Sequence, residues 1–408
     1  MGASGFKVYS YRWAVLAAFM LVIAVNQLSW ITFAPITTQA MNFYGVSDLE
    51  IGLLSLSFMA VYVVISFPAS WIIDTYGIRV GVGIGAALTG LFGLLRGLTA
   101  SSYAGILVAQ IGIAIGQPFI LNAITTVAGR WFPANERATA SGLGSLSIYV
   151  GILLGLALTP YLVLRTSIPG MLILYGVGGL LAMLVFFIVA RDRPPSPPCP
   201  PEEDVRSMVL EGLAKMLRQR SFILLLAVFF VGLGVFNAAT TWIEQILSPR
   251  GFSATQAGDA GGLMILGGIL GAVLLPMLSD RAHRRVPYLV LAVAGSTVGL
   301  AGVTLAASYT LLLASSFVFG FFLLSAGPLG FQYGAEITFP APEGTSNGLL
   351  LLMGQISGIA FILGLDAAKA PNTGSMTLPL LVLMGLMASC LVLTAGLTEA
   401  PRIPQGPQ

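Results

Sequence analysis

The sequence predicts an all-α membrane protein with twelve transmembrane helices in two pseudo-symmetric six-helix bundles, and three observations support this prediction. Of the 408 residues, 56% are apolar and only 9% are charged, whereas about a quarter of residues in soluble proteins are charged. Uncharged apolar runs of 18 or more residues recur along the chain, and each can cross a hydrocarbon core about 30 Å thick. Short motifs also recur 206 residues apart, which indicates an internal duplication.

The apolar runs place the helices along the chain. We expect spans at about 13–37, 51–73, 80–98, 103–127, 140–163, 170–190, 222–247, 258–278, 286–307, 310–332, 348–365 and 376–397. These form an N-terminal bundle (1–190) and a C-terminal bundle (221–408), joined by a polar linker (191–220). The linker opens with a proline-rich spacer and continues with apolar residues at helical spacing. Its second part predicts either an amphipathic helix on the inner membrane surface or a solvated linker helix.

The distribution of Lys and Arg predicts the orientation of the chain. An even number of spans places both termini on one side of the membrane. If that side is the cytoplasm, 15 of the 19 basic residues lie inside, and only Arg96, Arg165, Arg250 and Lys369 lie outside. The positive-inside rule therefore predicts cytoplasmic termini in a plasma membrane, or in the inner membrane of a bacterium.

Composition and motifs exclude several classes of function. A net charge of +3 with scattered basic residues does not fit a nucleic-acid binder. Cys199 and Cys390 form no metal or redox spacing, and His283 is the only histidine. The sequence has no nucleotide-binding loop and no catalytic set of side chains. We expect a monomer that is not an enzyme, has no cofactor or metal, and meets a small-molecule substrate and the lipid bilayer.

The internal repeat has two blocks. Segment 45–52 (GVSDLEIG) corresponds to 251–258 (GFSATQAG), and Asp74 corresponds to Asp280, all at an offset of 206. A second block, FPANE at 132–136 and FPAPE at 339–343, recurs at an offset of 207. Two parallel six-helix halves joined by a cytoplasmic linker suit an alternating-access transporter, whose site lies between the halves near the membrane midplane.

The loop at 70–79 (SWIIDTYGIR) resembles the GxxxDRxGRR loop of the major facilitator superfamily, and so does its second copy at 276–285 (PMLSDRAHRR), in which His283 takes the glycine position. In that superfamily the loop carries a cytoplasmic charge relay, in which a carboxylate pairs with basic groups and a helix terminus. The resemblance and the second repeat block imply relay roles for Asp74, Arg79, Glu136, Arg137, Asp280, Arg281, Arg284, Arg285 and Glu343. Ordinary positive-inside loop charges are the alternative interpretation.

Segments across both halves and the linker look like the feline leukaemia virus subgroup C receptor family of haem and choline transporters. They are NQLSWI (26–31), FPASWIID (67–74), QPFIL (117–121), RWF (130–132), PPSPP (194–198) and, the longest, AEITFPAPEGTSNGL (335–349). The resemblance implies a uniporter-like carrier of a small quaternary or primary amine, with haem as another cargo assigned to that family. It also implies a central site lined by Trp30, Gln117 and Gln355. The position of the family's seventh-helix tyrosine holds Asn237, which removes one aromatic wall.

The residues of the first, fourth and eleventh spans also favour a polar site. Asn26 and Gln27 share a helix face with Trp30. An indole face attracts an ammonium group by about 0.5–2 kcal/mol, and the amides of Gln117 and Gln355 can both donate and accept hydrogen bonds. Packing of the tryptophan and interhelical bonding of the glutamines are the alternatives.

The seventh span carries one polar stripe. Asn237, Thr240, Thr241 and Glu244 stand at i, i+3, i+4 and i+7. Glu244 could neutralise a cationic substrate, carry a coupling proton through a raised pKa, or cap an outer gate.

We therefore expect a secondary transporter of a small organic solute, an amine such as choline or ethanolamine, working by alternating access and facilitated diffusion. One alternative is a proton-coupled carrier of an organic anion or haem, with Glu244 as the proton site and Arg96 or Arg165 as counter-charge. The other is a membrane substrate sensor that does not transport.

Overall fold

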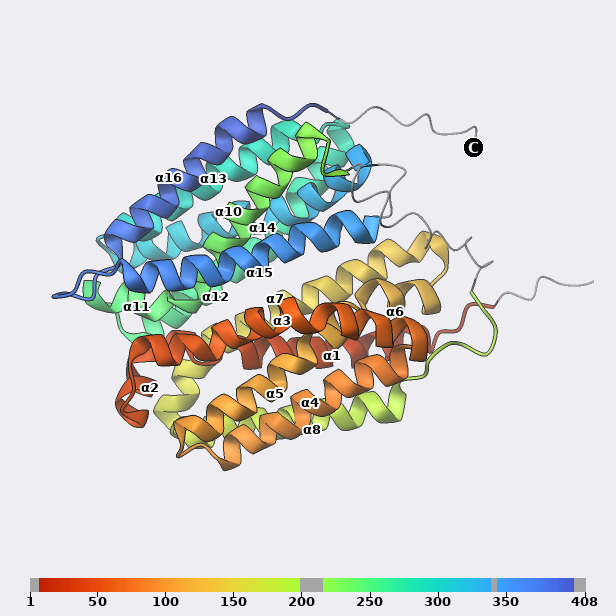
Figure 1. The fold of residues 1–408 in the computed structure, drawn as a ribbon, viewed down its shortest axis with the longest axis horizontal. Coiled ribbons are helices and arrows are strands. Elements are labelled where there is room, and N and C mark those ends of the chain that lie inside the picture. The colour runs from red at the N-terminus through yellow and green to blue at the C-terminus, as the bar shows by residue number, and fades with distance from the viewer. Residues whose placement is uncertain (1–6, 199–215, 339–342, 400–408) are drawn as a thin grey trace, which may run out of the picture. The chain divides into compact units, whose positions relative to one another are not determined.

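The computed structural model describes residues 7–198, 216–338 and 343–399, and every regular element within them is a helix (Figure 1). Within this part of the chain, 12 helices are long and apolar enough to cross a membrane. The predicted fold class and number of spans are therefore confirmed. Most of the predicted amphipathic linker helix lies outside the described residues.

The chain forms two compact units. Unit 1 consists of Met1–Glu202 together with Thr241–Ser248 and Ser253–Gly262. Unit 2 consists of Glu203–Thr240, Pro249–Phe252 and Leu263–Gln408. The division falls inside the predicted linker, and short segments that follow the seventh span join unit 1.

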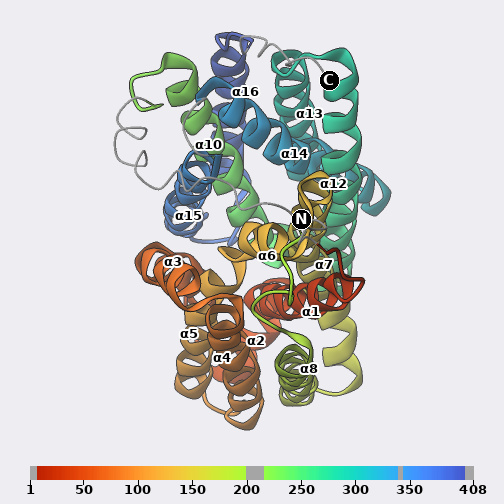
Figure 2. The same ribbon diagram turned by 90° about the vertical axis from the view of Figure 1, so that its right-hand side faces the viewer.

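Unit 1 contains the first six spans, and Figure 2 shows several of its helices nearly end-on. Its elements are α1 (Arg12–Ile31), η1 (Ala34–Ile36), α2 (Thr37–Tyr44), α3 (Asp48–Tyr76), α4 (Ile78–Leu98), α5 (Tyr103–Leu121), α6 (Ile124–Trp131), α7 (Ala134–Arg165), α8 (Ile168–Val189) and the short α11 (Ile243–Leu247).

Unit 2 contains the seventh span and most of the following five. Its elements are α10 (Arg220–Thr241), η3 (Ser248–Arg250), α12 (Ala254–Ala282), α13 (Val286–Leu305), α14 (Tyr309–Thr338), α15 (Glu343–Ala367) and α16 (Thr377–Ala395). The first turns of α12 belong to unit 1.

The internal repeat recurs in the hydrogen bonds that start the second helix of each half. The Ser47 hydroxyl accepts a hydrogen bond from the Glu50 backbone N–H, and the Glu50 carboxylate accepts one from the Ser47 N–H. Ser253 and Gln256 make the same reciprocal pair before α12. Such a capping box satisfies backbone donors at a helix start, so each copy fixes this helix start in the same way.

The first and seventh spans are interrupted, which corrects the continuous helices expected at 13–37 and 222–247. The helix α1 ends at Ile31, and the chain turns through a 3-10 segment that contains Pro35 before α2 begins. Proline lacks an N–H and cannot continue a helical hydrogen-bond ladder. In the seventh span, α10 ends at Thr241, while the Thr240 hydroxyl donates to the carbonyls of Phe236 and Asn237. Such bonds to the preceding turn weaken a helix, and Glu244 consequently lies beyond the break, in α11.

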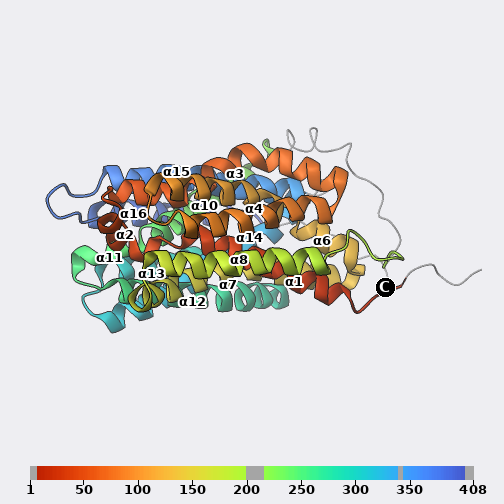
Figure 3. The ribbon, with the colours of Figure 1, turned by 90° about the horizontal axis from the view of Figure 1, so that it is seen from below.

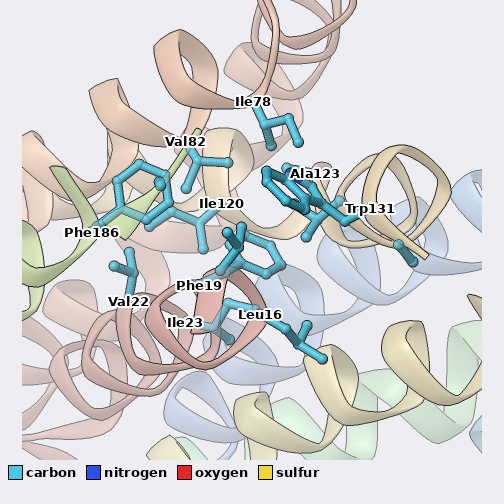
Figure 4. Close-up of a cluster of buried hydrophobic side chains, with 14 of the residues drawn as sticks. Leu16, Phe19, Val22, Ile23, Ile78, Val82, Ile120, Ala123, Trp131 and Phe186 are labelled. Atoms are coloured by element: carbon cyan, nitrogen blue, oxygen red, sulfur yellow. The ribbon is translucent and has the colours of Figure 1, made fainter. Parts of the chain in front are cut away.

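A large apolar cluster fills unit 1 at one end of α1. Figure 4 shows Phe19, Ile23, Val82, Ile120 and Phe186 from α1, α4, α5 and α8 meeting in this cluster. In lipid, burying apolar groups brings little hydrophobic gain, so close packing is the main source of stability.

Small residues allow close contacts between helices in unit 1. The helices α4 and α8 lie side by side (Figures 1 and 2), and α8 also runs along α1 (Figure 3). A Cβ on Gly176 would lie 2.6 Å from the Gly93 carbonyl oxygen, so this crossing requires glycine.

Candidate substrate site

Side chains from three helices bind the carbonyl groups at the end of α1. The Ser29 carbonyl accepts hydrogen bonds from Arg96 Nη1 (3.0 Å) and from Gln110 Nε2 (3.1 Å). The Trp30 carbonyl accepts one from Ser55 Oγ at 3.2 Å. The last carbonyls of a helix lack partners within the helix, so these side chains stabilise the interruption of the first span.

Trp30 is held inside unit 1. Its side chain is only 5% exposed, and its Nε1 donates to the Ser55 carbonyl at 3.2 Å. The indole therefore faces protein, as the sequence interpretation required, and does not face lipid.

Asn26 and Gln27 form a polar group one turn before Trp30. Asn26 is fully buried, and its Nδ2 donates to Thr89 Oγ1 at 3.0 Å and to the Ile113 carbonyl at 3.3 Å. Its Oδ1 accepts a bond from Gln27 Nε2 at 3.3 Å. These bonds connect α1 to α4 and α5. Asn26 has no exposed surface in this structure, so its role here is to hold the polar group together.

Gln117 lies on α5, one turn after Ile113. Its side chain is 5% exposed and makes no hydrogen bond within the described residues. An amide that has no protein partner and keeps some accessible surface can bind a ligand. Of the residues predicted for the first half, Gln117 is therefore the buried one whose whole amide has no hydrogen-bond partner in the described part of the chain.

In unit 2 the structure brings two predicted residues together. Asn237 Nδ2 donates to the carbonyl of Gly354 at 3.0 Å, and Gly354 directly precedes the half-buried Gln355. The bond leaves Asn237 Oδ1 as an acceptor with no donor in the described part of the chain. Gln355 also makes no hydrogen bond there, so unit 2 offers an amide oxygen and a complete amide.

Glu244 makes a compact polar contact in unit 1. The side chain is 4% exposed, and its Oε2 accepts hydrogen bonds from Thr38 N (2.9 Å), Thr38 Oγ1 (3.0 Å) and Gln245 Nε2 (3.2 Å). No Lys or Arg pairs with it within the described residues. Nearby, Thr241 is 2% exposed, and its hydroxyl is buried with no partner there.

The surroundings of Glu244 favour its neutral form. Burial raises the pKa of this carboxyl above the ordinary glutamate value, and the bonds from Thr38 and Gln245 offset only part of the increase. Thr38 and Glu244 stand 206 residues apart, which is the offset of the repeat, so equivalent positions of the two copies contact each other.

In unit 1, the predicted relay residues divide into two groups. Glu136 makes a two-point ion pair with Arg12, with contacts of 3.0 and 3.2 Å. Arg137 donates to the Phe132 carbonyl at 3.4 Å. Asp74 and Arg79 are exposed and form no ion pair within the described residues, so their relay role remains a prediction.

The charge at the start of α4 comes from the linker. Asp192 Oδ1 accepts hydrogen bonds from the Ile78 N–H at 2.7 Å and from Arg130 Nη1 at 2.8 Å. A carboxylate at a helix N-terminus satisfies a free N–H and interacts favourably with the helix dipole.

In unit 2, Arg285 is the centre of a group of ion pairs. It forms ion pairs with Asp280 and, at 3.0 Å, with Glu336, while its backbone N–H donates to Glu399 at 3.1 Å. Burial alone would lower the pKa of Arg285, but the two carboxylates raise it. Arg281 and Arg284 are exposed, and the side chain of Glu343 lies outside the described residues.

Several polar contacts were not expected from the sequence. Because equivalent positions stand 206 or 207 residues apart, comparing the two copies would have identified some of them: Thr38 corresponds to Glu244, and Asp192 to Glu399. Arg130 and Glu336 belong to no charge motif shared by the two copies.

Comparison with known proteins identifies the class. The family model of the Major Facilitator Superfamily matches residues 19–362, and the chain belongs to this superfamily of transporters. The chain is also similar to a crystal structure of a bacterial homologue of the human lysosomal transporter Spinster in an inward-facing, unoccupied conformation. That match has a TM-score of 0.70 and 16% identity over 95% of this chain and 96% of the other.

Relatives found by sequence similarity indicate to which branch of the superfamily the chain is similar. Solute carrier family 49 member A3 of Danio rerio is 32% identical over 98% of this chain and 90% of its own length. The Choline/ethanolamine transporter FLVCR2 of Homo sapiens is 28% identical over 87% of this chain and 71% of its own length. The resemblance to the feline leukaemia virus subgroup C receptor family is therefore confirmed.

Proposed function

We propose that this transporter carries a small amine-bearing solute of the ethanolamine or choline class, by alternating access and facilitated diffusion. Trp30 and Gln117 of unit 1 and Asn237 and Gln355 of unit 2 are the residues that bind it. The similarity to a choline/ethanolamine transporter supports this substrate class.

The observation that carries the proposal is that Trp30 is buried and hydrogen-bonded inside the protein. An indole that packs against lipid or marks the interface needs no fixed partner inside the protein. Trp30 is 5% exposed, lies at a helix interruption and bonds to Ser55. Interrupted helices in transporters commonly mark the binding site, because irregular backbone inside a membrane occurs where it lines a cavity.

The residue at position 237 favours a primary amine over a quaternary one. A primary ammonium group has three N–H donors, and an amide oxygen such as that of Asn237 can accept a hydrogen bond from one of them. A quaternary ammonium has none and depends on aromatic faces. With asparagine at the position of the family's tyrosine, we expect ethanolamine to be preferred over choline.

The test is uptake of labelled ethanolamine and choline into proteoliposomes. Trp30→Ala should reduce uptake at least tenfold, whereas the matched control Trp71→Ala should not, because Trp71 is 56% exposed on α3. Asn237→Tyr should shift preference towards choline. Normal uptake by Trp30→Ala would disprove the site, and binding without flux would favour the sensor alternative.

A second candidate, proton-coupled transport, rests on Glu244 alone. Its carboxyl is buried without a basic partner in the described residues, and its pKa is raised. If uptake required an imposed proton gradient, and Glu244→Gln abolished accumulation while sparing exchange, this candidate would replace facilitated diffusion. Otherwise we assign the contact between Glu244 and Thr38 to an outer gate.

A further inference from the structure

Arg96 is a buried charge that the proposed site does not use. It lies in the last turn of α4 and has 0% exposure. No carboxylate pairs with it within the described residues. A charged side chain inside a membrane span is costly unless other groups compensate it, so its partners should reveal its role.

The end of α1 supplies that compensation. Arg96 Nη1 donates to the Ser29 carbonyl at 3.0 Å and to Gln110 Oε1 at 2.7 Å. Gln110 Nε2 donates to the same carbonyl at 3.1 Å, and the Phe33 ring lies 5.9 Å from the guanidinium carbon. A helix C-terminus carries unpaired carbonyls and the negative end of the dipole, both of which attract a cation.

We propose that Arg96 and Gln110 are positioning residues that fix the indole of Trp30, an inference that rests on the proposed substrate role of Trp30. They hold the Ser29 carbonyl, which directly precedes Trp30, from one side. Ser55 exchanges two hydrogen bonds with Trp30 from the other side. The backbone and the ring are thus fixed together, which lowers the entropic cost of binding a substrate against the ring.

The remaining nitrogens of Arg96 argue against a direct role in binding an anion. Both Nε and Nη2 are buried and have no hydrogen-bond partner within the described residues. Neither offers surface to a ligand in this structure. Arg96 therefore acts through α1, and it does not serve as the counter-charge of an anionic substrate.

The experiment compares Arg96→Met, Arg96→Lys and Gln110→Met with the control Arg250→Met. Arg250 also binds backbone carbonyls at a helix end, those of Val303 and Ala306 after α13, but it lies in unit 2 and far from Trp30 in sequence. Uptake of labelled ethanolamine gives KM and the maximal rate, and thermal unfolding gives Tm. Trp30 fluorescence anisotropy is measured in a background in which the other four tryptophans are phenylalanine.

We expect Arg96→Met to raise KM about tenfold and to lower the anisotropy of Trp30, with smaller changes for Gln110→Met. Arg96→Lys, which keeps a charged donor, should restore part of both. Arg250→Met should lower Tm without changing KM or anisotropy. If Arg96→Met fails to fold, Gln110→Met tests the inference, because it removes only the neutral one of the two side chains that bind the Ser29 carbonyl.

The inference is wrong if Arg96→Met and Gln110→Met lower Tm but leave KM and Trp30 anisotropy at the values of the parent protein. If Trp30→Ala leaves uptake intact, the proposed substrate site fails on its own. The anisotropy would then still report whether Arg96 and Gln110 fix the indole, so the two failures are distinguishable.

Discussion

The two corresponding loops of the repeat, before α4 and before α13, both contain a residue with positive φ, but they differ in the rest of their backbone conformation and in charge pairing. In each copy, a residue with positive φ precedes the next helix: Gly77 (φ +90°) before α4 and His283 (φ +52°) before α13. In each copy, a carboxylate from beyond the last helix of that half binds the N–H groups at the helix start. Asp192 binds the first copy in this way and Glu399 the second, at an offset of 207.

The ion pairs differ between the loops. In unit 1 the acid that caps the helix, Asp192, pairs with Arg130. In unit 2 the acid that caps the helix is Glu399, and Arg285 pairs instead with Asp280 and Glu336. The need to satisfy the N–H groups at a helix start is therefore met twice by the same arrangement. The ion pairs next to the capping carboxylate, in contrast, differ between the two loops.

The largest effect is expected from Gly77→Ala. A Cβ at this position would overlap Asp192 Oδ1, and φ of +90° is strained for any residue with a side chain. The strain and the loss of the Asp192 cap together should lower stability by about 2–4 kcal/mol. Thermal unfolding in detergent measures the loss. An unchanged Tm would mean that the geometry at Gly77 does not determine the stability of this loop.

Replacing Arg285 should cost more stability than replacing Arg130. Arg285→Met leaves Asp280 and the half-buried Glu336 without their shared cation, which should cost about 1–3 kcal/mol. Arg130→Met should cost at most about 1 kcal/mol, because Asp192 keeps the N–H of Ile78 and lies 3.5 Å from Arg193. The difference in Tm between the two variants is the measurement, and equal losses would contradict the contrast between the loops.

The sequence was sufficient for the fold but not for all of the site. Twelve spans and the duplication follow from apolar run length and fixed offsets, which depend on local composition. The interruptions after Ile31 and Thr241 were missed because prolines and polar residues do not always end a helix: Pro68 and Pro118 lie inside continuous helices of the same chain. The partners of Arg285 and Asp192 were missed because ion pairs between distant segments depend on tertiary structure. Trp30 could be proposed from the sequence because a tryptophan among amides deep in a span is unusual, and its buried position is what the structure adds.

A third prediction concerns Thr38 and Glu244, the equivalent positions that contact each other. Because burial raises the pKa of Glu244, protonation stabilises this contact. The stabilisation is complete below the ordinary glutamate pKa of about 4.3, and it is lost as pH rises through the raised value. Opening of the contact should therefore become easier with increasing pH.

Labelling of Thr241→Cys by a membrane-impermeant thiol reagent measures this opening, after Cys199 and Cys390 are replaced by serine. Labelling should increase with pH more steeply when residue 244 is glutamate than in Glu244→Gln. The glutamine variant is the control because it can still accept the Thr38 bonds and because it shares the intrinsic pH dependence of the thiol. The same slope in both proteins would exclude Glu244 as the titrating group.

The smallest effect, and the one of opposite sign, is expected from His283→Gly. His283 occupies the position of Gly77, but its φ of +52° costs a residue with a Cβ about 1–2 kcal/mol. Glycine removes this strain but loses more backbone freedom on folding, so the net gain should be about 0.5 kcal/mol. A rise in Tm for His283→Gly together with a fall for Gly77→Ala would establish that a positive φ is required at both positions. A fall in both variants would mean that the His283 side chain stabilises the second loop, and the two copies would then differ in backbone energetics as well as in charge.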